Sequence, residues 1–480
     1  MRSRITETKL SMRVTTTCLS AIGVVIAAVF VFAEQGESIK IPNLFPFPNS
    51  SGVAETFSSN GSIDLSNPFF QGLGTNGRAC VSCHLPDQGW SIAADRVQLR
   101  FYLTDGTDPI FRTNDGSNCD HNIDTSTLAG RRQAYSLLTS RGLIRIAIDV
   151  PAGAEFEVAD VHNPYGCSER GTLSIYRRPL PSTNLRALSA VMWDGRESTP
   201  PSTEKITFAT NPSDLLFDLG HQSVDATLGH AQARVPPTTQ QQQEIVDFEM
   251  GLSTAQAFDN QAGDLNAHGA TGGPFNLAHQ KFFVGINDPF GGNPFGTAFT
   301  PLVFGLFQSW SNLDDEDRGA AARAAIARGE RLFNSKPIDI TGVAGLNEDL
   351  GVAHIPGTCG TCHDSPNIGN HSLPVPLNIG VGDTNSPLDV SYLPVITLRN
   401  KTTNQIVQTT DPGRALITGK WEDIGKVKGP ILRGLASRAP YFHNGSAKTL
   451  GDAVNFYNSR FNLGLTAQEK ADLVAFLNSL

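Results

Sequence analysis

Two short cysteine motifs with the same spacing are the residues of this chain best suited to chemistry. Residues 80–84 and 359–363 both read C-x-x-C-H. In this pattern two thiols bond to the two vinyl groups of one haem, and the adjacent histidine ligates the iron. A zinc site would draw two such pairs together, and a redox dithiol would not require the histidine in both copies. The motifs therefore predict two covalently bound haem c groups, held by Cys80, Cys83, His84, Cys359, Cys362 and His363.

The first 33 residues have the pattern of a secretory signal peptide. Arg2, Arg4 and Lys9 form a basic start, residues 19–32 are largely apolar, and Ala33 offers a small residue at a cleavage position. The apolar run is short for a membrane-spanning helix, although an uncleaved anchor stays open as the alternative. We therefore expect residues 1–33 to direct the chain to the periplasm.

Two further cysteines, Cys119 and Cys167, follow the first motif. In an oxidising compartment two leftover cysteines usually pair, and two free buried thiols are the alternative. We expect a structural disulfide that takes no part in catalysis.

The composition excludes several classes of protein. The 480 residues carry a formal net charge of −9, with 46 glycines and 29 prolines and only 17% charged residues. This describes a loop-rich globular chain and not a disordered one. No basic stripe is available to neutralise phosphates, so we expect no nucleic-acid partner. No stretch after residue 40 is apolar for long enough to span a bilayer.

The elements that must position the motifs are expected to be mainly helices. Residues 314–333 have helical spacing and lead into the second motif, and a final helix begins at Thr466 with Glu469 completing a capping box. Further helical stretches are expected near 183–193 and 240–252. We expect a mostly α fold of two cytochrome c-like haem domains, 34–312 and 313–480.

With two further motifs the chain resembles the bacterial dihaem cytochrome c peroxidase and MauG family. Residues 193–196 read W-D-G-R and residues 438–445 read R-A-P-Y-F-H-N-G. The resemblance extends over roughly residues 65–480 and is interrupted by long loop-rich insertions around 95–175 and 255–300. It implies that the N-terminal haem reacts with peroxide, that the C-terminal haem passes electrons to it, and that Trp193 lies between them. The C-x-x-C-H motif alone is shared by all c-type cytochromes, so the other two motifs carry the specificity.

The resemblance also suggests an unusual ligand for the second haem. Typical dihaem peroxidases use a methionine there, but no methionine follows His363. Tyr457 stands at the matching position, as in the MauG arrangement, and a tyrosinate ligand would favour higher oxidation states of the iron. A buried tyrosine with a satisfied hydroxyl is the alternative, and His443 and Tyr441 are weaker rivals.

For the peroxide pocket the family uses a glutamine and an acid–base carboxylate soon after W-D-G-R. Gln222 is the best match for the glutamine, and no glutamate stands at the expected distance from it. His230 would then replace the carboxylate as proton shuttle, because imidazole titrates near neutrality. Structural or haem-propionate roles for His221 and His230 stay open.

Other site residues are left as open alternatives. His121 or His162 could cap the first haem as a resting sixth ligand. The family's calcium ion between the domains would fall near Arg438 and Pro440, with Asn184 as a nearby candidate ligand.

Three functions compete for this chain. The first is a periplasmic peroxidase that reduces hydrogen peroxide with electrons from a small cytochrome c or cupredoxin. The second is a MauG-like oxidase that acts through a bis-ferryl state on a partner protein or organic substrate. The third is a dihaem electron-transfer cytochrome without catalysis. A homodimer is compatible with each.

Overall fold

The computed structural model describes residues 39–167, 171–197, 212–313 and 319–480. It is 32% helical and 18% strand, with 13 strands in five small sheets among the described residues. The expected mostly α fold is therefore wrong. The supposed insertions contain paired strands. Two of these strands, at residues 156–162 and 252–259, pair with strands far away in the sequence, so no local periodicity predicts them.

All sheets are antiparallel. The four-stranded sheet has the order β2 (Phe47–Asn49), β3 (Gly52–Ser58), β8 (Leu252–Asp259), β9 (Gly263–Asp264). The three-stranded sheet has the order β13 (Ile406–Thr409), β12 (Val395–Asn400), β6 (Phe156–His162). The two-stranded sheets pair β1 (Lys40–Pro42) with β4 (Ser62–Asp64), β5 (Ile144–Asp149) with β7 (Thr172–Arg177), and β10 (Ile338–Ile340) with β11 (Ile355–Gly357).

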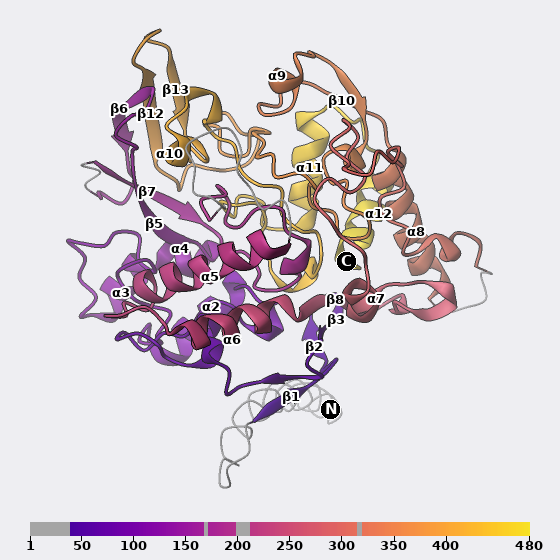
Figure 1. The fold of residues 1–480 in the computed structure, drawn as a ribbon, viewed down its shortest axis with the longest axis horizontal. Helices are drawn as coiled ribbons and strands as arrows, with labels where there is room; N and C mark the ends of the chain where they lie inside the picture. The colour runs from indigo at the N-terminus through magenta and orange to yellow at the C-terminus, as the bar shows by residue number, and fades with distance from the viewer. Residues whose placement is uncertain (1–38, 168–170, 198–211, 314–318) are drawn as a thin grey trace, which may run out of the picture.

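Strands β6 and β12 join the two halves of the chain. Strand β6 lies in the expected N-terminal domain and β12 in the C-terminal one, and they pair along their length, as the upper left of Figure 1 shows. The division near residue 312 stays a prediction, and the two halves share this sheet.

The described helices range from four to 18 residues in length. Their bounds are α2 (Ala94–Thr104), α3 (Leu128–Ala134), α4 (Ser136–Arg141), α5 (Pro212–Gly229), α6 (Thr239–Met250), α7 (Gly273–Ala278), α8 (Ala320–Ser335), α9 (Asn347–Leu350), α10 (Ala415–Thr418), α11 (Leu450–Arg460) and α12 (Ala467–Asn478). The helix expected at 314–333 is present as α8, with 314–318 outside the described residues. The stretch 183–193 holds only the 3-10 turn Leu185–Ala187, so the helix expected there is wrong.

The C-terminal helices form the support of the second motif. Thr466 caps α12 through the backbone N–H of Glu469, as the sequence predicts. Helix α12 crosses α8 at Gly329, where a Cβ atom would come within 2.0 Å of the Asp472 carbonyl oxygen. Only glycine fits such a backbone approach. Phe476 of α12 is fully buried among aromatic rings there. Figure 1 shows α8, α11 and α12 grouped together.

The expected signal peptide is not tested by the structure. Residues 1–33 lie outside the described residues, so the signal peptide stays a prediction. None of the helices in the described ranges has the length and apolar character needed to cross a bilayer.

The expected disulfide is confirmed, because Cys119 and Cys167 are bonded across 48 residues of sequence. We expect the double variant Cys119→Ser, Cys167→Ser to unfold with a free energy lower by about 2–4 kcal/mol, because the bond restricts the unfolded chain. Denaturant unfolding under non-reducing conditions measures this difference. An unchanged unfolding midpoint and slope would show that the bond contributes nothing.

Candidate functional site

The first motif forms a 3-10 turn over Cys80–Ser82 that opens onto a largely apolar cavity. Cys80, Cys83 and His84 all line this cavity. The His84 Nδ1 lies 3.0 Å from the carbonyl oxygen of Trp90, so this nitrogen donates and Nε2 is left as the free lone-pair nitrogen. Burial lowers the pKa of His84 to about 4, which keeps the imidazole neutral. A neutral imidazole with a fixed tautomer is the form that ligates iron.

The second motif repeats this construction. Its 3-10 turn spans Cys359–Thr361, and Cys359, Cys362 and His363 line a second cavity. The His363 Nδ1 donates to the carbonyl oxygen of Gly369, 2.6 Å away and again six residues further along the chain. The four motif thiols are free of disulfides. The two thiol pairs face different cavities, so they do not build one four-thiol zinc site, and each motif fits a separate haem.

The two cavities share one wall. The residues that line both are Trp193, the three cations Arg178, Lys428 and Arg438, and the three prolines Pro179, Pro181 and Pro430. The indole N–H of Trp193 donates to the Arg178 carbonyl oxygen at 2.8 Å, and the Trp193 carbonyl accepts from the Lys428 N–H at 2.7 Å. Trp193 therefore lies between the two motif-lined cavities and is held from both sides.

Buried charges fix the W-D-G-R segment. Asp194 is fully buried and bonded to Arg177 at 2.5 Å and to Arg196 at 3.1 Å. Arg177 also bonds Asp411 from the C-terminal half. Arg414 donates to the carbonyl oxygens of Asp194 and Gly195. The segment that carries Trp193 is thus anchored to both halves of the chain.

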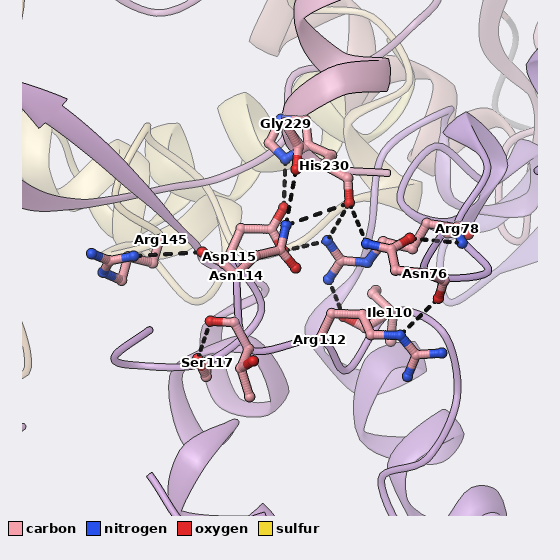
Figure 2. A network of polar contacts seen from close by, with 12 residues as sticks. Asn76, Arg78, Ile110, Arg112, Asn114, Asp115, Ser117, Arg145, Gly229 and His230 are labelled. Carbon is pink, nitrogen blue, oxygen red and sulfur yellow. Dashed lines mark hydrogen bonds and ion pairs between the residues drawn. The ribbon is translucent and has the colours of Figure 1, made fainter. Parts of the chain in front are cut away.

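The first cavity contains the polar side chains expected for a peroxide pocket. Gln222 and His230 both line it, Gln222 from the middle of α5 and His230 directly after its last residue. Figure 2 shows the network behind His230, in which its Nδ1 bonds Asp115 and Asp115 bonds Arg78. Burial alone would raise the pKa of Asp115, but its bonds to His230 and Arg78 hold it below the usual value. The aspartate thus stays ionised and orients the imidazole.

Asp115 was not predicted from the sequence, because it lies 115 residues before His230, its hydrogen-bond partner. Glu197 was missed as well, although it directly follows W-D-G-R. Its carboxylate is buried and lies 2.6 Å from Nδ1 of His221, which does not line the first cavity. In the sequence, the only indication of a role for Glu197 is its position next to the W-D-G-R motif. Nothing in the sequence indicates a role for Asp115.

The two candidate sixth ligands lie elsewhere. His121 is bonded to Asp120 and half-exposed, and His162 is an exposed residue on β6. Neither lines the first cavity.

Tyr457 projects from α11 into the second cavity. Its ring centroid lies 6.5 Å from that of His363, with the rings inclined at 73°. Within the described ranges its hydroxyl has no hydrogen-bond partner, so the alternative of a satisfied hydroxyl finds no support. Burial, followed by the nearby thiols Cys362 and Cys359, raises the pKa of this phenol.

The rivals of Tyr457 line the same cavity but differ in their partners. The Tyr441 hydroxyl donates to the Leu435 carbonyl oxygen at 3.0 Å. His443 is buried 3.7 Å from Asp411, and burial lowers its pKa to about 4. His371, which sequence reasoning missed, is buried there too, 3.4 Å from Asp364. Tyr457 is therefore the residue whose oxygen is left for a ligand role.

Asn184, the nearby candidate for a calcium ligand, uses its side chain for other contacts. The Asn184 side chain exchanges two hydrogen bonds with the backbone of Thr254. Pro440 lines the second cavity and Arg438 both. This arrangement gives no support for calcium at Asn184.

Comparisons with known proteins agree with the motifs. No family model matches the chain. It is 36% identical over 135 residues to the cytochrome-c peroxidase IdrP2 of Denitromonas iodatirespirans, a match that covers 26% of this chain and 36% of that protein. It is 40% identical over 76 residues to the cytochrome c peroxidase Ccp of Escherichia coli (strain K12), covering 15% of this chain and 16% of the relative. These curated relatives confirm the resemblance to the cytochrome c peroxidase family, whose members are oxidoreductases.

The matched regions span about a third or less of the curated relatives. A solved structure of a MauG-like protein associated with microbial copper homeostasis aligns over 87% of this chain and 88% of its own, at 15% identity and a TM-score of 0.34.

The buried charges around Asp194 lead to a pH-dependent prediction. Although burial alone would raise it, Arg196 and Arg177 hold the pKa of Asp194 at about 2, below its ordinary 3.8. A carboxylate with a lowered folded pKa stabilises the fold above its unfolded pKa and loses this contribution as the pH falls. We therefore expect Asp194→Asn to cost about 3–5 kcal/mol near neutral pH and to flatten the loss of stability between about pH 4 and pH 2.

Urea unfolding across this pH range measures both effects. The control is Asp160→Asn, which changes an exposed carboxylate on β6. An Asp194→Asn protein as stable at neutral pH as the control would contradict the anchoring role of this ion pair.

Proposed function

We propose that this chain is a dihaem c-type peroxidase, exported to the periplasm, that reduces hydrogen peroxide to water. Two electrons from a small cytochrome c or cupredoxin and two protons convert one peroxide into two water molecules. The observation that carries the proposal is the wall containing Trp193, which separates two cavities that each present a C-x-x-C-H motif. The disulfide supports an oxidising compartment.

The motif residues would hold the two haems. Cys80, Cys83 and His84 would bind one, and Cys359, Cys362 and His363 the other. When bound, the haems supply a peroxide-binding iron in the first cavity and an electron store in the second. Trp193 supports the transfer between them because an aromatic ring at the shared wall shortens the gap that electrons must cross.

His230 would move the proton in the first cavity. Because Asp115 holds Nδ1, the remaining nitrogen Nε2 is the one available to peroxide. It would accept a proton from one oxygen of the peroxide and return it to the other oxygen, which leaves as water. Gln222 lines the same cavity and can orient the peroxide by a hydrogen bond.

The second cavity favours a MauG-like oxidase as the second candidate function. The free hydroxyl of Tyr457 opposite His363 is the specific observation, because phenolate ligation stabilises oxidised iron. Such an enzyme would oxidise a partner protein or an organic substrate in place of a small redox protein.

The role of His230 can be tested against a closely matched histidine. His121 also bonds an aspartate through Nδ1, and both side chains are 44% exposed, but His121 lies outside the first cavity. We expect His230→Gln to lower peroxide-dependent oxidation of a reduced small cytochrome c by about 10²–10⁴-fold, since it removes general acid–base catalysis. His121→Gln should stay near wild type.

Three outcomes of this assay separate the functions. Equal loss in both variants would remove His230 from the mechanism. Peroxide consumption without oxidation of the cytochrome, but with oxidation of the chain or an added organic substrate, would favour the MauG-like function. If the wild type with both haems bound consumed no peroxide, the remaining function would be that of an electron-transfer cytochrome without catalysis.

The ligand of the second haem has its own test. We expect Tyr457→Phe to change the ferric absorption and electron paramagnetic resonance spectra of one haem only, because an axial oxygen is lost. Tyr441→Phe is the control, since its hydroxyl lines the same cavity but bonds a backbone carbonyl. Spectra unchanged by Tyr457→Phe would place the ligand elsewhere, and His443 would be examined next.

A further inference from the structure

The cavities are lined by four cationic side chains that have no carboxylate partner among the described residues. These are Arg178, Lys428, Arg433 and Arg438, and all four line the first cavity. Arg178, Lys428 and Arg438 line the second as well. Two other buried cations, by contrast, are paired with carboxylates: Arg177 bonds two aspartates, and Lys426 bonds Asp423 at 3.2 Å.

The guanidinium groups of this set are only partly satisfied. Arg178 donates to backbone carbonyl oxygens, including that of Arg438 at 2.9 Å. Arg433 and Arg438 also donate to carbonyls, but the buried Nε of each has no hydrogen-bond partner. Backbone carbonyls carry no full charge, so these contacts do not neutralise the cations.

Lys428 is the least satisfied member. Its Nζ lies 6.0 Å from the centroid of the Trp193 ring. Within the described part of the chain this nitrogen makes no hydrogen bond. The side chain is 8% exposed. Burial, together with the charge of Arg438, lowers the pKa of Lys428 to about 8.

Buried charges of one sign require anions to offset their desolvation. Two buried carboxyl groups line the first cavity, and neither is paired with any of the four cations: Glu249 forms no ion pair with them, and Asp115 bonds Arg78 and His230. A bound group that enters the cavities would supply the missing negative charge.

We propose that Lys428, Arg178, Arg433 and Arg438 bind the propionate carboxylates of the two haems, with Lys428 serving both across the shared wall. Each haem c carries two propionates, so two haems bring four carboxylates to four cations. This inference rests on the two-haem part of the proposed function. Free inorganic anions share the same chemistry and are the alternative occupants.

The test compares haem-loaded variants. Lys428→Met removes the charge at nearly the same volume, Lys428→Arg keeps it, and Arg433→Met changes a residue that lines only the first cavity. Lys426→Met is the control, because Lys426 is also buried but is paired and lines neither cavity. Mass spectrometry first establishes two haems per chain, and a chain with fewer would fail the proposed function and not this inference.

Two measurements then apply. Spectroelectrochemical titration should give more negative reduction potentials for both haems in Lys428→Met and for the first haem alone in Arg433→Met, because a cation stabilises the reduced, less positive iron. Lys428→Arg and Lys426→Met should stay near wild type. Resonance Raman spectra of the charge-conserving Lys428→Arg should show a shifted propionate bending mode, a signal that free anions cannot produce.

Potentials in Lys428→Met that move no more than in Lys426→Met would overturn the proposal. An unshifted propionate mode in Lys428→Arg would overturn it independently, even if Lys428→Met fails to accumulate. Such a result would indicate that the four cations bind free anions and not haem propionates.

Discussion

Arg177 holds together the wall on which both cavities depend. It ends β7, and its buried guanidinium bonds Asp194 next to Trp193 and Asp411 from the C-terminal half. The following residue, Arg178, already lines both cavities. Removing three charged groups from water is costly, and the ion pairs repay this only in a fixed geometry. That geometry locks the position of Trp193 relative to both motifs.

The two motifs are built by the same local device. In each, the histidine donates through Nδ1 to a carbonyl six residues later, and the residue carrying this carbonyl has a positive φ, +58° at Trp90 and +81° at Gly369. A phenylalanine ring packs near each histidine, Phe69 at 6.3 Å and Phe333 at 6.0 Å between ring centroids. The cavities differ in what faces the histidine. The first offers His230 and Gln222, and the second offers Tyr457.

Features set by a short stretch of chain were predictable from the sequence. The two motifs, helix α8 and the capped start of α12 depend on neighbours a few residues away. The disulfide followed from counting cysteines in a chain that is expected to be exported. Spacing also misled at 183–193. There Leu185, Leu188 and Val191 recur as on a helix, yet they line the first cavity from an irregular segment.

Features set by distant partners could not be predicted. Strand β6 has no recognisable signature without β12, more than 230 residues away in the sequence. Asp115 can orient the His230 imidazole only because the fold brings Arg78 and His230 into contact with it. The unpaired cations of the shared wall are recognisable only once their burial and their lack of carboxylate partners are known. Tyr457 and Trp193 were found through motif resemblance, and the structure adds which cavity each of them lines.

Covalent binding of two haems on either side of one wall can be tested by peptide mapping with mass spectrometry of the denatured, periplasmically expressed full chain. One haem is expected on the peptide containing Cys80 and Cys83 and a second on the peptide containing Cys359 and Cys362. Haem on only one of these peptides, or on neither, would show that the chain does not bind two haems in this way.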